Sequence, residues 1–141
     1  MNNPPVFKGI ATALVTPFSR DGIDFVSFGR LIEFQLTNGI DALVVCGTTG
    51  EAPVMSFEEE KQVIEFAVRQ AKGRVPVIAG TGGNDIKTVC RLSEYACQVG
   101  VNALMVVTPY YNKTTKKGLV ECYEEISACT DKPIIVYNVP S

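Results

Sequence analysis

The chain has 141 residues, of which 46% are hydrophobic and 20% are charged, and its net charge is −2. This length is sufficient for one domain with its own core, and the near-neutral charge gives no reason to expect nucleic acid or an anionic membrane as a partner. No apolar run approaches the roughly 20 residues that cross a bilayer, and Met1-Asn-Asn-Pro-Pro5 lacks the basic and apolar regions of a signal peptide, so we expect a cytoplasmic protein.

The histidine and cysteine content limits the kinds of catalytic and metal site that the chain can form. The sequence has no histidine, which excludes Ser-His-Asp catalysis, Cys-His catalysis and His-ligated metal sites. The five cysteines are odd in number and form no C-x-x-C pair, which argues against a disulfide framework or a zinc ribbon. We therefore expect small buried thiols and no bound metal.

Strand-like and helix-like patterns alternate along the chain. Apolar runs predict strands, apolar residues at a period near 3.6 predict helices, and Gly39, Gly73 and Gly100 are helix stop signals. The second helix opens with the capping box Ser56-Phe-Glu-Glu59. In chain order we expect strand 9–16, helix 24–39, strand 42–46, helix 56–73, strand 76–79, helix 84–100, strand 103–107, helix 115–129 and strand 134–137.

The character of these strands indicates the fold class. They are continuous apolar runs, which is typical of parallel strands covered on both faces. Residues 39–45 resemble 100–107, and 74–78 resemble 131–135, a two-βα repeat that suits a (βα)8 barrel better than a doubly wound sheet. Because such a barrel takes about 250 residues, residues 1–141 are either the first part of a barrel or a complete five-stranded open sheet, in both cases one α/β domain.

Glycines and hydroxyls gather at the predicted strand ends. Gly47-Thr-Thr-Gly-Glu51 follows the second strand, and a turn of this kind exposes N–H groups and two hydroxyls that suit a small carboxylate or phosphate. Gly80-Thr-Gly-Gly83 resembles a phosphate-binding loop, but it lacks the G-x-G-x-x-G spacing and the Walker lysine, so we interpret it as a tight turn. We expect Glu51 to cap the following turn rather than to act as a base.

Three tyrosines lie at the ends of the last two predicted strands. Tyr110 and Tyr111 lie after the fourth strand, and Tyr137 ends the fifth. Phenol and hydroxyl groups within hydrogen-bond reach can transfer a proton without histidine. The strand ends therefore predict a carboxylate pocket beside phenols.

Four motifs at consecutive strand ends, Gly47-Thr-Thr-Gly-Glu51, Ala79-Gly-Thr-Gly82, Thr108-Pro-Tyr-Tyr-Asn112 and Tyr137-Asn-Val-Pro-Ser141, resemble the dihydrodipicolinate synthase family over the whole chain. The resemblance implies the first five strands and four helices of a (βα)8 TIM barrel, in a homotetramer built from tight dimers. It also implies a lyase that condenses pyruvate with aspartate semialdehyde in lysine and diaminopimelate biosynthesis. A lysine captures pyruvate as a Schiff base, so no cofactor is expected.

The resemblance also assigns roles to residues of this chain. It implies a proton relay of Thr48, Tyr111 and Tyr137, with Tyr137 as the acid/base beside the Schiff base and Tyr111 delivered across a dimer interface. Thr49, with Thr48, is expected to hold the pyruvate carboxylate. The Schiff-base lysine is expected on a sixth strand beyond residue 141, and no lysine of this chain is placed to replace it, so we expect the chain alone to be inactive.

A possible effector site is implied as well. Asn84 and Tyr110 match the lysine-feedback site of regulated bacterial members. Ala52-Pro53 and Thr88 replace more polar residues there, and the chain has no histidine. We expect weak or absent regulation by lysine in a full-length parent.

Three other interpretations stay open. One is an N-acetylneuraminate lyase or keto-deoxy sugar acid aldolase of the same superfamily, although the double threonine and the Tyr-Tyr-Asn and Tyr-Asn-Val-Pro-Ser motifs favour the synthase. The second is a non-catalytic half-barrel that binds small keto acids or self-associates. The third is an independent flavodoxin-like binding module, which requires a phosphate loop or an acidic cluster that the strand ends lack.

Overall fold

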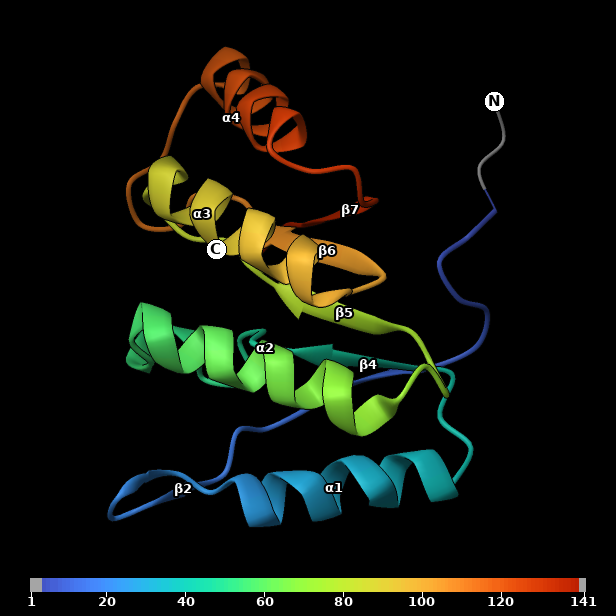
Figure 1. The fold of residues 1–141 in the computed structure, drawn as a ribbon. Helices are drawn as coiled ribbons and strands as arrows, with labels where there is room; N and C mark the ends of the chain where they lie inside the picture. The colour runs from blue at the N-terminus through green and yellow to red at the C-terminus, as the bar shows by residue number, and fades with distance from the viewer. Residues whose placement is uncertain (1–3, 140–141) are drawn as a thin grey trace.

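The long apolar runs of the sequence form the strands of one parallel sheet (Figure 1). The computed structural model describes residues 4–139. All neighbouring strands of this five-stranded sheet run parallel, in the order β1-β4-β5-β6-β7. Their bounds are β1 Ala11–Ala13, β4 Ala42–Val45, β5 Val77–Gly80, β6 Ala103–Val107 and β7 Ile134–Tyr137.

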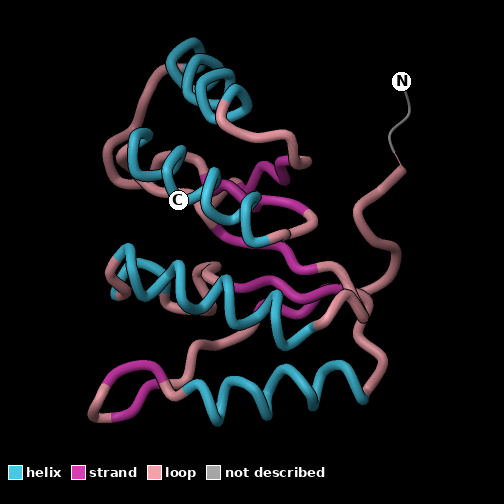
Figure 2. Tube along the Cα trace, viewed as in Figure 1, coloured by secondary structure: helices cyan, strands magenta, loops and turns pink. Residues whose placement is uncertain are grey.

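Four helices connect the strands and lie side by side in the same order (Figures 1 and 2). Side chains cap each helix at its N-terminus, and the expected capping box of Ser56 and Glu59 is confirmed. Within residues 4–139, no helix combines the length and apolar character needed to cross a membrane. The helices are α1 Phe25–Thr37, α2 Phe57–Ala71, α3 Ile86–Val99 and α4 Lys116–Ala128.

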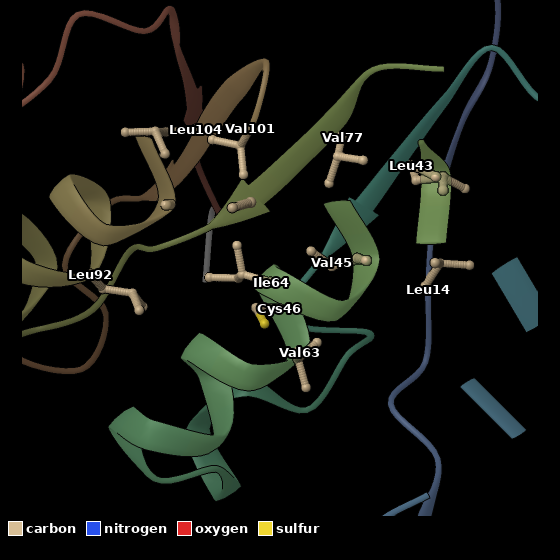
Figure 3. Packing of buried hydrophobic residues seen from close by; sticks show 14 of the residues in the cluster. Leu14, Leu43, Val45, Cys46, Val63, Ile64, Val77, Leu92, Val101 and Leu104 are labelled. Carbon is tan, nitrogen blue, oxygen red and sulfur yellow. The ribbon is translucent and has the colours of Figure 1, made fainter. Parts of the chain in front are cut away.

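Alternate side chains of each strand enter two different apolar clusters. Leu43 and Val45 of β4 lie on the face that the helices cover, in the cluster drawn in Figure 3. Ala42 and Val44 lie on the opposite face, where no helix packs and the segment before β1 contributes Val6 and Phe7. The helices therefore cover one face of the sheet, as on the outside of a barrel.

The predicted α/β class, parallel sheet and helices are confirmed, and the differences are local. The first strand is only Ala11–Ala13: the positive φ of Gly9, 110°, is not a strand conformation, and the bond from Leu14 N–H to Val44 O is the last to β4 before the chain turns toward Pro17. Three short elements were not expected from the sequence: the antiparallel pair β2 (Phe18–Ser19) and β3 (Gly22–Ile23), and the 3₁₀ helix η1 (Ala52–Val54). These elements are too short to show a hydrophobic period.

The cysteines are less buried than expected. All five are free thiols, and only Cys46 is buried, at the end of β4. The expectation of buried thiols is wrong for the other four, which are half-buried because they lie on helices or at a helix end: Cys90, Cys97, Cys122 and Cys129.

Replacement of Leu104 tests the helix-covered core. This side chain is fully buried on β6, so Leu104→Ala is expected to lower the free energy of unfolding by about 2–5 kcal/mol. Val54→Ala is the control, because Val54 is 70% exposed and its truncation is expected to change stability by less than about 0.5 kcal/mol. Urea unfolding followed by circular dichroism measures both, and equal losses would contradict this core assignment.

Candidate carboxylate-binding site at the strand ends

Parallel strands place all their carboxyl ends on one edge of the sheet, and a pocket of about 500 Å³ opens there. It is lined from β4 to β7 by the residues that follow each strand, together with side chains of α2 and α3. The strand-end residues in its wall include Gly47, Thr48, Gly80, Gly82, Asn84, Val107, Tyr110 and Tyr137.

The turn at residues 47–50 is the most distinctive part of this wall. It starts with Cys46, whose φ of 54° is left-handed, a conformation that side chains adopt only at a cost and that clusters at functional sites. The turn closes through bonds from Gly50 N–H to Gly47 O (3.0 Å) and from Glu51 N–H to Thr48 O (3.1 Å). Within residues 4–139, the N–H groups of residues 47–49 donate to no protein acceptor. Consecutive open N–H donors of this kind suit an anion.

Close backbone approach requires glycine at two neighbouring positions. A Cβ on Gly80 would overlap the carbonyl of Cys46, and a Cβ on Gly82 would overlap the backbone N of Val107. Both glycines therefore serve the packing of adjacent strand ends. This packing supports the interpretation of residues 80–83 as a tight turn.

Hydrogen bonds tie the strand-end loops to one another. Asn84 Oδ1 accepts from Tyr110 N–H at 3.0 Å, between the loops after β5 and β6. Thr108 N–H donates to Tyr137 O at 2.8 Å, between β6 and β7. These hydrogen bonds hold the loops at the rim of the pocket together without a ligand. Such preorganisation lowers the conformational entropy that is lost when a ligand binds.

The structure brings together some of the predicted site residues but not all. Thr48, Tyr137, Asn84 and Tyr110 line the same pocket. Thr49 is exposed beside Thr48 on the turn and is not part of the wall.

Tyr111 stands apart from the other predicted site residues. It does not line the pocket, and its side chain is 99% exposed. Its φ of 66° is also left-handed, which is rare for a bulky residue. Tyr111 therefore does not join Thr48 and Tyr137 in the pocket wall of this chain.

The expected capping by Glu51 is wrong. Glu51 occupies the N-cap position of η1 with a left-handed φ of 57°, and its side chain makes no capping hydrogen bond. This backbone conformation, rather than the carboxylate, completes the turn. Glu51 is exposed and does not line the pocket.

Sequence reasoning missed two ionisable groups of the pocket. Burial raises the pKa of Glu60, on α2, to about 7. Burial, and the charge of Glu60, raise the pKa of the Cys46 thiol, so this sulfur stays protonated and unreactive. One clue to Glu60 was present, because it precedes the buried Val63 and Ile64 by three and four residues and so shares their helix face.

No lysine lines this pocket in the part of the chain that the structure describes. Lys61 and Lys87 lie on α2 and α3. Lys8 and Lys132 precede β1 and β7, at the amino-terminal ends of the strands, away from the pocket. Lys113, Lys116 and Lys117 are exposed in the segment that follows Tyr111. The pocket can bind an anion, but it contains no amine nucleophile from these residues.

Known proteins are similar to this chain in both sequence and fold. The profile of the Dihydrodipicolinate synthetase family matches residues 6–141. A 4-hydroxy-tetrahydrodipicolinate synthase of Thermoanaerobacter sp. (strain X514) is 54% identical over 137 residues, which cover 97% of this chain and 46% of that protein. The chain thus spans about half the length of the curated relatives it matches.

Two solved structures show the same arrangement of elements. The dihydrodipicolinate synthase of Aquifex aeolicus superposes with a TM-score of 0.93 at 50% identity, over 95% of this chain and 46% of that one. The chloride-inhibited enzyme of Acinetobacter baumannii, solved in complex with pyruvate, has a TM-score of 0.91 at 43% identity, over 94% and 46%. The profile match over residues 6–141 shows that the chain belongs to the Dihydrodipicolinate synthetase family.

Proposed function

We propose that this chain is the amino-terminal part of a lyase that condenses pyruvate with aspartate semialdehyde to 4-hydroxy-tetrahydrodipicolinate, for lysine and diaminopimelate biosynthesis. The observation that carries the proposal is the turn at residues 47–50, which presents open N–H groups beside the hydroxyl of Thr48 in the same pocket as Tyr137. Family membership and the pyruvate complex of the Acinetobacter relative support the choice of a keto acid.

In this proposal the turn holds the carboxylate and the phenol handles protons. The N–H groups of residues 48 and 49 and the hydroxyl of Thr49 donate to the carboxylate oxygens. The carboxylate is thereby fixed, and the keto carbon points into the pocket toward Tyr137. Tyr137 and Thr48 exchange the proton that moves when the keto oxygen is lost as water.

Two parts of the proposed active site come from outside this pocket. The amine that attacks the keto carbon belongs to a lysine of polypeptide beyond this chain, because no lysine lines the pocket. Tyr111 completes the relay in a second copy of the protein. This assignment is supported by the 99% exposure of Tyr111 and by its absence from the wall of its own chain's pocket.

We further propose that the sheet is the first five strands of an eight-stranded barrel within a homotetramer. Apolar side chains are exposed beside both edge strands, with Ile10 70% exposed next to β1 and Val136 60% exposed on β7. The relatives are about twice as long as this chain, so the remaining barrel strands would pair with both edges. A non-catalytic half-barrel that binds keto acids is the second candidate, and the lack of a pocket lysine favours it for the isolated chain.

The effector assignment concerns the outer wall of the pocket. Asn84 and Tyr110 lie there, joined by a hydrogen bond, together with Thr88 and Glu60. A half-buried carboxyl with a pKa raised to about 7 is a poor fixed charge for an amine at neutral pH. We therefore propose weak or absent feedback regulation by lysine.

Pyruvate titration of the ¹⁵N-labelled chain tests the proposed function. The amide resonances of Thr48 and Thr49 are expected to shift, and Thr49→Val is expected to weaken binding about fivefold because one hydrogen bond to a charged group is lost. Thr37→Val, an exposed threonine at the end of α1, is the control and leaves binding unchanged. Shifts confined to residues outside the strand-end loops would rule the site out.

Borohydride trapping tests whether any lysine of this chain forms a Schiff base with pyruvate. After incubation of the chain with pyruvate and borohydride, mass spectrometry is expected to find no pyruvyl adduct, because no amine lines the pocket. A stoichiometric adduct on any lysine of this chain would overturn this part of the proposal.

Sedimentation velocity tests the open sheet edges. The isolated chain is expected to self-associate as its concentration rises, since unpaired apolar edges recruit other strands. The double variant Ile10→Lys/Val136→Lys is expected to shift the population toward monomer. Gln98→Lys is the control, because it adds a charge at an exposed position of α3. If the control shifts the population toward monomer as much as the double variant does, the edge assignment is contradicted.

Unfolding as a function of pH tests the burial of Glu60. Its pKa in the folded state, about 7, lies above the value of an unfolded chain, so its contribution to stability is present at acidic pH and is lost as the pH rises through 7. Glu60→Gln is expected to remove this loss and to raise stability at pH 8 by on the order of 1 kcal/mol, a value discounted for the side chain's partial exposure. Glu124→Gln, exposed on α4, is the control, and a parallel pH response of Glu60→Gln and wild type would contradict the burial.

A further inference from the structure

Thr16 is one of the few buried polar residues and sits beside the strand-end turn. Among residues 4–139 the buried polar side chains are Thr16, Thr81 and Ser93. The hydroxyls of Thr81 and Ser93 bond to each other at 2.9 Å, between β5 and α3. The Thr16 hydroxyl, 4% exposed, instead donates to the carbonyl of Gly50 at 2.8 Å.

This hydrogen bond crosses from the end of β1 to the far end of the 47–50 turn. The two residues are 34 positions apart in the sequence. They follow the paired strands β1 and β4, whose backbones bond as far as Leu14 N–H and Val44 O (2.9 Å), and the Thr16–Gly50 bond extends this link beyond the end of the pairing. Gly50 itself is tightly packed, since a Cβ there would lie 3.1 Å from the carbonyl oxygen of Leu14 and 3.2 Å from the N of Cys46. The turn therefore packs against the end of β1, and the Thr16 hydroxyl bonds the two segments together.

The open N–H groups lie between two fixed points. Cys46, with its left-handed backbone, sets the direction of the chain before residues 47–49, and the Thr16–Gly50 bond sets its position after them. The turn has few bonds of its own, through Gly50 N–H and Glu51 N–H. Loss of the Thr16 hydroxyl would leave the Gly50 carbonyl buried without a donor, and the turn would shift to find one.

We propose that Thr16 is a positioning residue that holds the carboxylate-binding turn in its binding geometry through the Gly50 carbonyl. It does not touch the ligand. The inference rests on the proposed function for the identity of the ligand, a small keto acid, and on the hydrogen bond and packing for the role of Thr16.

A matched threonine on the same strand separates positioning from general stability. Thr12, on β1, donates its hydroxyl to Gln35 Oε1 of α1 at 2.9 Å, on the helix-covered face of the sheet. Thr12→Val and Thr16→Val make the same change, hydroxyl to methyl, four residues apart. Only the second removes a bond to the turn.

The test measures pyruvate affinity and ¹⁵N order parameters of Thr48 and Thr49 in the full 141-residue chain. Thr16→Val is expected to weaken pyruvate binding about tenfold and to lower the order parameters of both amides. Thr16→Ser, which keeps the donor, is expected to restore both within about twofold. Thr12→Val is expected to leave both unchanged even where it lowers stability.

Each other outcome bears on the proposal. Thr16→Val with wild-type affinity and wild-type order parameters would overturn it, as would Thr16→Ser behaving like Thr16→Val. If wild type binds no pyruvate, the proposed function fails, while the order parameters still decide the role of Thr16. If Thr16→Val does not fold, Thr16→Cys replaces it: its weaker donor must produce an intermediate loss of order, and no loss would overturn the proposal.

Discussion

The common direction of the strands is the constraint on which the rest of the structure depends. Because all neighbours in the sheet are parallel, each strand ends at the same edge and the chain must reverse there before every helix. The reversal after β4 uses the left-handed residues Cys46 and Glu51, and the N–H groups of residues 47–49 in it have no protein acceptor within residues 4–139. Gly80 against the Cys46 carbonyl and the left-handed Cys46 itself are direct results. The pocket therefore exists because the sheet is parallel.

The same constraint divides the proposed active site between this chain and other polypeptide. The turn at residues 47–50 follows β4 and Tyr137 ends β7, and Thr48 of the turn lines one pocket with Tyr137. Within the described residues the edge strands β1 and β7 each pair on one side only, and apolar side chains such as Ile10 and Val136 lie exposed beside them. In the proposed function, a lysine of other polypeptide, a second copy that uses Tyr111 and further barrel strands complete the site at the sides that this chain leaves open.

Much of this could be predicted from sequence, because burial and capping leave local patterns. The runs at 42–45 and 77–80 are buried on both faces, so their apolar continuity marked them as parallel strands. Ser56 with Glu59 marked the start of α2. The polar residues after each strand were placed on one edge by topology alone, and Thr48 and Tyr137 do share a pocket.

The parts that could not be predicted depend on contacts distant in sequence. The burial of Glu60 arises from the packing of α2 against the strand ends, and the Thr16–Gly50 bond joins two separate loops. The position of Tyr111 outside the pocket follows from a left-handed backbone at a bulky residue, which residue type alone argues against. The helical period places Glu60 on the buried face of α2 but does not show what covers it, and local propensity does not reveal the Thr16–Gly50 bond or the position of Tyr111.

The central claim is that the 47–50 turn holds a small carboxylate. A crystal of the chain soaked with pyruvate tests it most directly. The predicted result is a carboxylate whose oxygens accept from the N–H groups of Thr48 and Thr49, with the keto carbon facing Tyr137. Pyruvate bound elsewhere, or a turn whose N–H groups stay unoccupied at saturating pyruvate, would contradict it.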